Sequence, residues 1–228
     1  YKDSYRVAYS QTNMLIANTL ASGKTVSEQD RNTITQLVQQ AIREARNAIT
    51  LNPLKVTNVE NLAGIYRSLL NFAQGADAWT LASYQQAIIL DPINPNLRIA
   101  LGGVFYSQKN YDDAIRMFQS ATDVKPDLEN AHYNLALAYK EKKQNEAAIA
   151  SLEKTLALLE KSSEDYAKAS KELDELKATL PPVETQKTSA PSQLTTPEAT
   201  LPKPKIVPPL PAAVIAPDEF IVNWLLEP

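Results

Sequence analysis

The stretch from Asn94 to Asp127, NPNLRIALGGVFYSQKNYDDAIRMFQSATDVKPD, decides the fold. It predicts two short helices with a tight turn between them, because Asn94 is a good N-cap and Pro95 fits the first helical position. Counted from Pro95 as position 1, positions 7, 8, 11, 17, 20, 24, 27 and 32 hold small, apolar or aromatic residues and a closing proline, namely Leu101, Gly102, Phe105, Tyr111, Ala114, Phe118, Ala121 and Pro126. The small residues let neighbouring helices approach closely, and the aromatic residues fill the space between helix pairs.

This spacing resembles the tetratricopeptide repeat (TPR), a helix–turn–helix unit of 34 residues. One signature position departs, since Arg98 stands where the repeat has tryptophan. The resemblance implies an all-α fold. We expect a right-handed TPR superhelix of about four helix pairs plus a C-terminal capping helix, followed by a Pro-rich irregular tail.

Residues 1–180 are therefore expected to form the TPR domain. The predicted helix pairs cover about 3–51, 56–91, 95–125 and 129–159, with a capping helix at 163–180. In the first pair only the second helix matches the repeat well, and its start is predicted at the capping residue Ser27. In the second pair Thr57–Glu60 is interpreted as a capping box, and extra residues are needed near Gln74–Asp77.

The composition changes after residue 180, where eleven of the 15 prolines lie. Residues 181–217 are predicted to be a Pro-rich linker or tail with extended geometry. Residues 218–228 form an apolar segment in which Phe220, Ile221, Trp224 and Leu225 are spaced for one helical face. Such a segment either docks on this domain or a partner, or serves as a disordered short linear motif.

Composition excludes several function classes. A net charge of −3 over 228 residues predicts no nucleic-acid partner, and the lack of cysteine removes disulfides and thiolate chemistry. No run of about 20 apolar residues is present, so no membrane span is expected in this fragment.

A search for catalytic residues finds no candidate. The single histidine, His132, takes a position that a packing residue normally fills, and Asp112–Asp113 is interpreted as a helix first turn. The Lys140–Lys143 run is interpreted as a solvated turn, and Gly102–Gly103 as close packing inside a helix. Trp79 is interpreted as core packing beside the longer loop, with ligand stacking as the alternative. We predict a protein that is not an enzyme, with no metal site and no cofactor.

The resemblance also implies a peptide-binding groove. In TPR proteins the first helix of each pair lines a concave wall with positions 2, 5, 6, 9, 12 and 13. The residues carried over as groove candidates are Glu60, Asn61, Arg67, Asn96, Tyr106, Asn130, Tyr133, Asn134 and Lys140. Position 9 is glycine in two pairs, Gly64 and Gly103. The amides of Asn61 and Asn134 share position 6, where each could bind an extended peptide backbone. The lysine-rich carboxylate clamp of chaperone-type TPRs is not reproduced, so no carboxylate-terminated tail is predicted as ligand.

Two functions follow from these features. The first is a non-catalytic protein–protein interaction scaffold that binds a peptide or partner segment in the groove, including its own tail with Phe220 and Trp224, in cis or in trans. The alternative is a soluble extracytoplasmic regulatory or assembly domain of a membrane-anchored polysaccharide ligase or polymerase. Repeats followed by a tail such as LPKPKIVPPLP resemble the C-terminal parts of bacterial O-antigen ligase-type membrane proteins. Because Tyr1 is not a methionine, that hypothesis places a membrane tether upstream of it.

Overall fold

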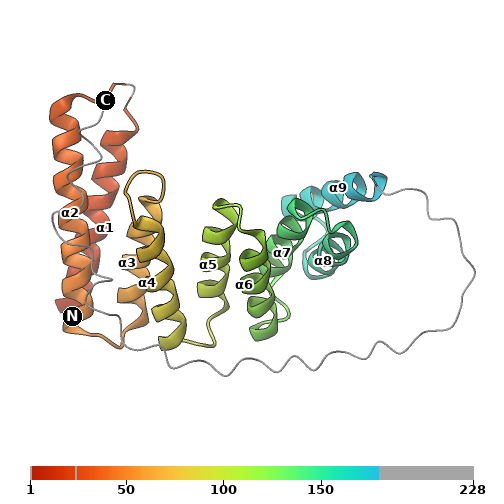
Figure 1. Cartoon of the computed structure of the whole chain (residues 1–228). Coiled ribbons are helices and arrows are strands. Elements are labelled where there is room, and N and C mark those ends of the chain that lie inside the picture. The colour runs from red at the N-terminus through yellow and green to blue at the C-terminus, as the bar shows by residue number, and fades with distance from the viewer. Residues whose placement is uncertain (1, 24, 180–228) are drawn as a thin grey trace, which may run out of the picture.

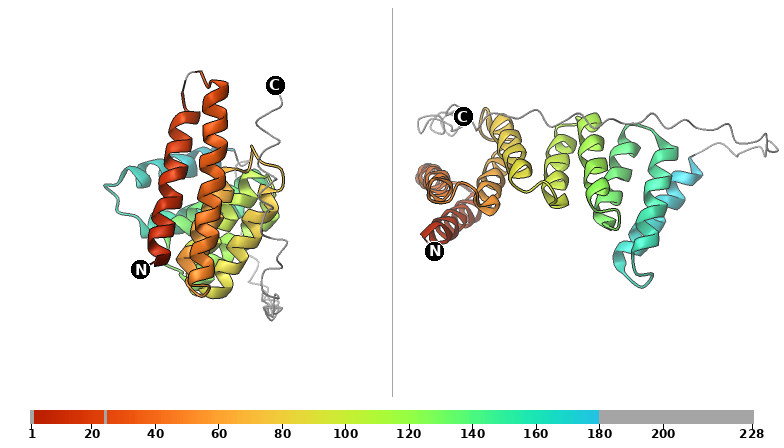
Figure 2. Two further views of the ribbon diagram at one scale, coloured as in Figure 1. Left: turned by 90° about the vertical axis from the view of Figure 1, so that its left-hand side faces the viewer. Right: turned by 90° about the horizontal axis from the view of Figure 1, so that it is seen from below.

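The computed structural model describes residues 2–23 and 25–179, and this part of the chain folds into nine α-helices without a strand (Figure 1). The helices are α1 (Lys2–Ala21), α2 (Glu28–Leu51), α3 (Val56–Ser68), α4 (Ala76–Leu90), α5 (Pro95–Ser107), α6 (Tyr111–Val124), α7 (Glu129–Glu141), α8 (Asn145–Leu158) and α9 (Glu164–Ala178). They stack as antiparallel pairs, with α1 and α2 at one end and α9 at the other (Figures 1 and 2). The expected all-α solenoid is confirmed, and the predicted tail segments lie outside the described residues.

Short polar side chains set where the helices begin. Ser27 caps α2 and Asn94 caps α5, as predicted. Ser27 also forms a complete capping box with Asp30, and the Asn94 side chain accepts from the backbone N–H of Asn96. The capping box predicted at Thr57–Glu60 is wrong. α3 starts at Val56, one residue before Thr57, and its N-cap makes no side-chain hydrogen bond.

The small residues of the repeat are buried between helices. Ala114, Ala121 and Ala148 each have 0% of their surface exposed. A Cβ added at Gly102 would lie 2.5 Å from Cε1 of Phe118, so only glycine lets α5 and α6 pack at this distance. The recurring small side chains therefore lie at the close helix contacts that stabilise each pair.

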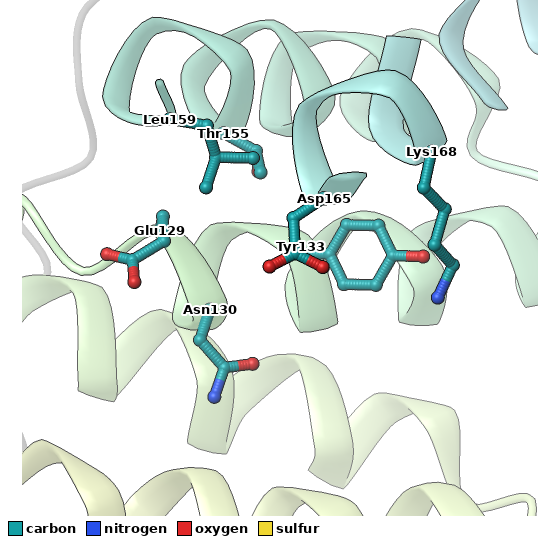
Figure 3. A pocket seen from close by; sticks show the side chains of 7 residues that line it. All are labelled: Glu129, Asn130, Tyr133, Thr155, Leu159, Asp165 and Lys168. Atoms are coloured by element: carbon teal, nitrogen blue, oxygen red, sulfur yellow. The ribbon is translucent and has the colours of Figure 1, made fainter. Parts of the chain in front are cut away.

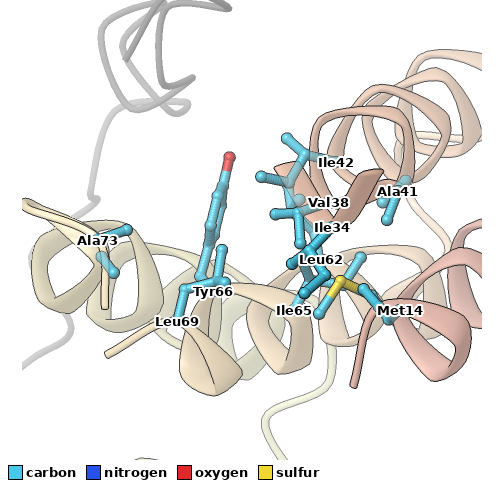
Figure 4. Packing of buried hydrophobic residues seen from close by; sticks show 13 residues of the cluster. Met14, Ile34, Val38, Ala41, Ile42, Leu62, Ile65, Tyr66, Leu69 and Ala73 are labelled. Atoms are coloured by element: carbon cyan, nitrogen blue, oxygen red, sulfur yellow. The ribbon is translucent and has the colours of Figure 1, made fainter. Parts of the chain in front are cut away.

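The largest apolar cluster joins α1, α2 and α3 and reaches the start of α4 (Figure 4). Met14, Val38, Ile42 and Leu62 meet there, and the aromatic ring of Tyr66 is fully buried. Burial of these side chains compensates for the poor match of α1 to the repeat signature, because apolar contact does not need the signature spacing.

A polar cluster ties α1 to the loop between α2 and α3. Asn58 is fully buried, and its Nδ2 donates to the backbone carbonyl of Ala48 at 2.9 Å, near the C-terminus of α2. Lys55 Nζ lies 2.9 Å from Oδ2 of Asp3. The hydrogen bond from Lys55 lowers the pKa of the Asp3 carboxyl to about 2. Asp3 is therefore ionised at neutral pH and binds the first helix to the second pair.

Candidate peptide-binding groove

The first helices α3, α5 and α7 carry all nine candidate groove residues, and none of the nine is buried. The exposed members are Arg67, Asn96, Asn130 and Lys140. The half-buried members are Glu60, Asn61, Tyr106, Tyr133 and Asn134. These positions are thus available at the surface, although the structure does not bring all of them into one cluster.

Three hydrogen bonds join successive first helices side by side. They connect Asn61 with Ser10 (2.8 Å), Tyr106 with Glu141 (3.5 Å) and Tyr133 with Glu172 (2.8 Å). Burial raises the pKa of the Tyr106 phenol, and the nearby Glu141 carboxylate raises it further. The hydroxyl therefore stays protonated and keeps donating.

The two asparagine amides at position 6 already have partners inside the protein. Asn134 Nδ2 donates to the carbonyl and the side-chain oxygen of Asn130, at 2.8 and 2.7 Å. Asn61 Nδ2 donates to Ser10, which is itself buried. The sequence predicts amides that are ready for a peptide backbone, whereas in the structure their N–H groups bond to Ser10 and to Asn130.

Two glycines open the wall. Gly64 lies in the middle of α3 and Gly103 in the middle of α5, and a Cβ added at either would have no atom within 4 Å. The sequence predicts close packing for Gly103 as well as for Gly102. That prediction is right for Gly102, which packs against Phe118. It is wrong for Gly103, because a Cβ there would meet no atom of the described residues within 4 Å. Packing within the domain therefore gives no reason for glycine at position 9.

A cavity of about 480 Å³ lies beside one of these glycines. Gly103, Val104 and Ser107 of α5 form one side of it, and Arg67 at the end of α3 forms the other. The cavity has room for more than one side chain of a bound segment, since small-molecule pockets begin at about 300 Å³. Arg67 is exposed, so its guanidinium can donate to a partner that enters from the surface.

A second cavity, of about 270 Å³, lies where α7, α8 and α9 meet (Figure 3). The α7 side chains are Glu129, Asn130 and Tyr133, and the other lining residues are Thr155, Leu159, Asp165 and Lys168. Two of the nine candidates, Asn130 and Tyr133, are thus brought together here. The volume suits a single side chain rather than a cofactor.

The electrostatics of this second cavity centre on Tyr133. Its hydroxyl donates to Oε1 of Glu172, and the Lys168 ammonium lies 5.2 Å from the centroid of its ring, within the range of a cation–π contact. A hydrogen bond with Tyr133 raises the pKa of Lys168, and burial raises that of Tyr133. The other carboxylate oxygen of Glu172, Oε2, is buried without a hydrogen-bond partner among the described residues.

The α9 side of this cavity was missed by sequence reasoning. Helix α9 was interpreted as a charged cap and nothing more. Continuing the 34-residue step beyond α7 would have placed Lys168 at position 6 of a fifth first helix, in line with Asn61 and Asn134. The contact between Tyr133 and Glu172 joins residues 39 positions apart, so no local sequence pattern indicates it.

The other residues weighed from sequence have structural roles. His132 Nε2 lies 2.9 Å from the carbonyl of Pro126, and Trp79 packs with its ring centroid 5.5 Å from that of Tyr66. Asp112 pairs with Lys142. Within residues 2–23 and 25–179 no group of three or more His, Cys, Asp or Glu could hold a metal ion. None of the helices described there combines the length and the apolar character that a membrane crossing requires.

Two family models match the sequence. One described as "TPR repeat" matches residues 102–143, and one described as "Tetratricopeptide repeat" matches residues 129–158. Residues 102–158 therefore carry tetratricopeptide repeats. No protein with a curated function matches it.

Solved structures share the fold. PilF of Pseudomonas aeruginosa has a TM-score of 0.54 at 20% identity, covering 77% of this chain and 68% of PilF. MamA has 0.52 at 19% identity, covering 68% and 85%. A thermophilic TPR protein of Thermus thermophilus, TTC0263, has 0.51 at 14% identity, covering 74% and 99%. None of these matches names an O-antigen ligase, so a ligase-type parent protein stays a prediction.

Proposed function

We propose that this chain, built from tetratricopeptide repeats, is a non-catalytic interaction scaffold that binds an extended or helical segment of a partner protein along α3, α5 and α7. The observation that carries the proposal is the pair of open glycines on that wall, Gly64 and Gly103. Because no described atom lies within 4 Å of a Cβ built at either glycine, there is space at the surface of two successive first helices.

The energetic argument is a comparison of three glycines. Glycine in a helix interior is less favourable than alanine by about 0.8–1.0 kcal/mol. At Gly102 the penalty is offset by close packing on Phe118. At Gly64 and Gly103 no contact within the described chain offsets it. A partner that approaches the helix backbone closely provides the missing reason, because a Cβ would hold it away.

Side chains around the glycines supply recognition. Tyr106 presents a half-buried ring that packs edge-on against Tyr111, which restricts its position before a partner binds. Arg67 stands at the 480 Å³ cavity, and Asn96 and Lys140 offer exposed polar groups. The 270 Å³ cavity beside Tyr133 can receive one side chain from the end of the bound segment. Affinity would come from aromatic and backbone contacts, and the exposed polar groups would set orientation.

The test is a peptide selection with the full 228-residue chain. Peptides of random sequence on phage are panned against the wild type and against a double variant, Gly64→Leu with Gly103→Leu. Both substitutions sit at open helical positions, so the variant should fold while its wall is filled. The matched control is Gln85→Leu, at an exposed position of α4.

We expect the selected peptides to bind the wild type and the control equally and to lose binding to the double variant. Circular dichroism of each variant confirms that the helices are intact. Peptides that bind the double variant as well as the wild type would show that the wall of α3 and α5 is not the binding surface.

A further inference from the structure

Helix α1 carries an apolar stripe along its outer side that no described residue covers. Tyr5 is 75% exposed, Leu15 67%, Tyr9 47% and Ile16 43%. Together with Thr12 and Thr19, these residues recur at helical spacing over about four turns. Scattered apolar residues at a surface are ordinary, whereas a continuous stripe along one helix indicates a binding surface.

The stripe points away from the rest of the domain. The buried residues of α1, among them Ser10, Met14 and Ala17, lie on the opposite side of the helix at 100° per residue. Hydrogen bonds further reduce the polarity of the stripe. The hydroxyls of Thr12 and Thr19 donate to carbonyls four residues earlier in the same helix, and the hydroxyl of Tyr9 accepts from Gln40. Both threonine side chains are exposed.

The two ends of the solenoid differ in this respect. At the far end α9 buries Ala169, Leu173 and Leu176 against α8 and carries charged residues elsewhere, which is the form of a capping helix. At the near end α1 has no charged residue from Val7 to Ala21 and presents the apolar stripe instead. A repeat array usually carries a polar outer surface at both ends, and no element among the described residues covers the apolar stripe of α1.

We propose that residues 218–228 of the same chain cover α1. In this segment, DEFIVNWLLEP, an uncharged apolar core lies between acidic ends, and Phe220, Ile221, Trp224 and Leu225 have the spacing of one helical face. An amphipathic helix laid on an apolar surface is a common mode of peptide recognition. Both partners lack charge along the contact, so docking leaves no buried ion without a partner.

The connecting chain is long enough. Helices in contact pack about 10 Å apart. The contacts α1–α3, α3–α4, α4–α5, α5–α7, α7–α8 and α8–α9 link the two ends of the domain, so α1 lies within about 60 Å of α9. Residues 179–217 span ~35 Å as a flexible coil. They reach ~120 Å as extended polyproline helix. The segment can therefore return to the N-terminal end of its own molecule.

A fluorescence experiment on the full chain tests this docking. The sequence has no cysteine, so Gln11→Cys places a single bimane label on an exposed position beside the stripe. Bimane is quenched by a tryptophan in contact with it, and Trp224 is the tryptophan of the segment. A second label at Glu153→Cys, exposed on α8, serves as the control position.

We expect the Gln11 label to be quenched independently of protein concentration, and the quenching to be lost with Trp224→Phe. A synthetic peptide of residues 218–228 should restore it in that variant. Ile16→Glu should also abolish the quenching, whereas Ile93→Glu, at a residue 79% exposed elsewhere, should not. An unchanged signal with Trp224→Phe or with Ile16→Glu would overturn the proposal. Quenching that disappears on dilution would assign the stripe to a second copy of the chain instead.

Discussion

Alanine at Gly64 and Gly103 should make the protein more stable and a poorer binder. A Cβ at either position meets no atom within 4 Å, so the substitution adds no collision. Each exchange should gain about 0.8–1.0 kcal/mol of helix propensity. Because the glycines lie on different helices and share no neighbour, the gains should add to about 2 kcal/mol. That corresponds to a rise of about 4–8 °C in the midpoint of thermal unfolding, which circular dichroism measures.

Gly102→Ala is the matched control, since it alters the residue next to Gly103. Its Cβ would lie 2.5 Å from the Phe118 ring, and overpacking of this kind costs about 1–3 kcal/mol. Binding of the selected peptides should weaken in the Gly64→Ala, Gly103→Ala double variant despite its higher stability. A lower midpoint for that variant would refute the view that these positions are open. A higher midpoint with unchanged binding would refute the link between the glycines and the partner.

Three further predictions concern stability, each measured by urea unfolding. Asn58→Ala should lower the free energy of unfolding by about 1–3 kcal/mol, because its buried side chain bonds the carbonyl of Ala48; no loss would mean that the bond is dispensable. Asp3 has its pKa lowered from 3.8 to about 2, so its stabilising contact with Lys55 is complete above pH 4 and is lost as the pH falls toward 2. Asp3→Asn should remove that part of the acid dependence, and an unchanged acid profile would contradict the assignment. Lys109 has a positive φ of 60°, so Lys109→Gly should stabilise by about 1 kcal/mol, and destabilisation would count against strain at this turn.

The solenoid could be predicted from sequence because its constraint is steric and repeats along the chain. A small residue is needed where two helices pack closely. Ala114 and Ala148 stand one repeat apart at such contacts, and Ala121 marks another within the same repeat as Ala114. The start of α2 at Ser27 followed from local hydrogen bonding for the same reason. In each case the cause lies within a few residues of the effect.

The features that sequence did not predict depend on distant partners. Whether Gly103 packs like Gly102 depends on which side of α5 meets α6, and that is settled only by the folded pair. The amide of Asn61 was expected to face a ligand, but Ser10 on α1 takes its N–H. Lys168 joined the candidate site because α9 turns its first half toward Tyr133.

Hydrogen–deuterium exchange of the full chain, with and without a selected peptide, tests the central claim most directly. If the peptide binds the wall of first helices, amides around Gly64 in α3 and around Gly103 in α5 should gain protection, as should amides of α7. The second helices α4 and α6 should stay unchanged. Protection confined to α4, α6 and α8 would contradict the account.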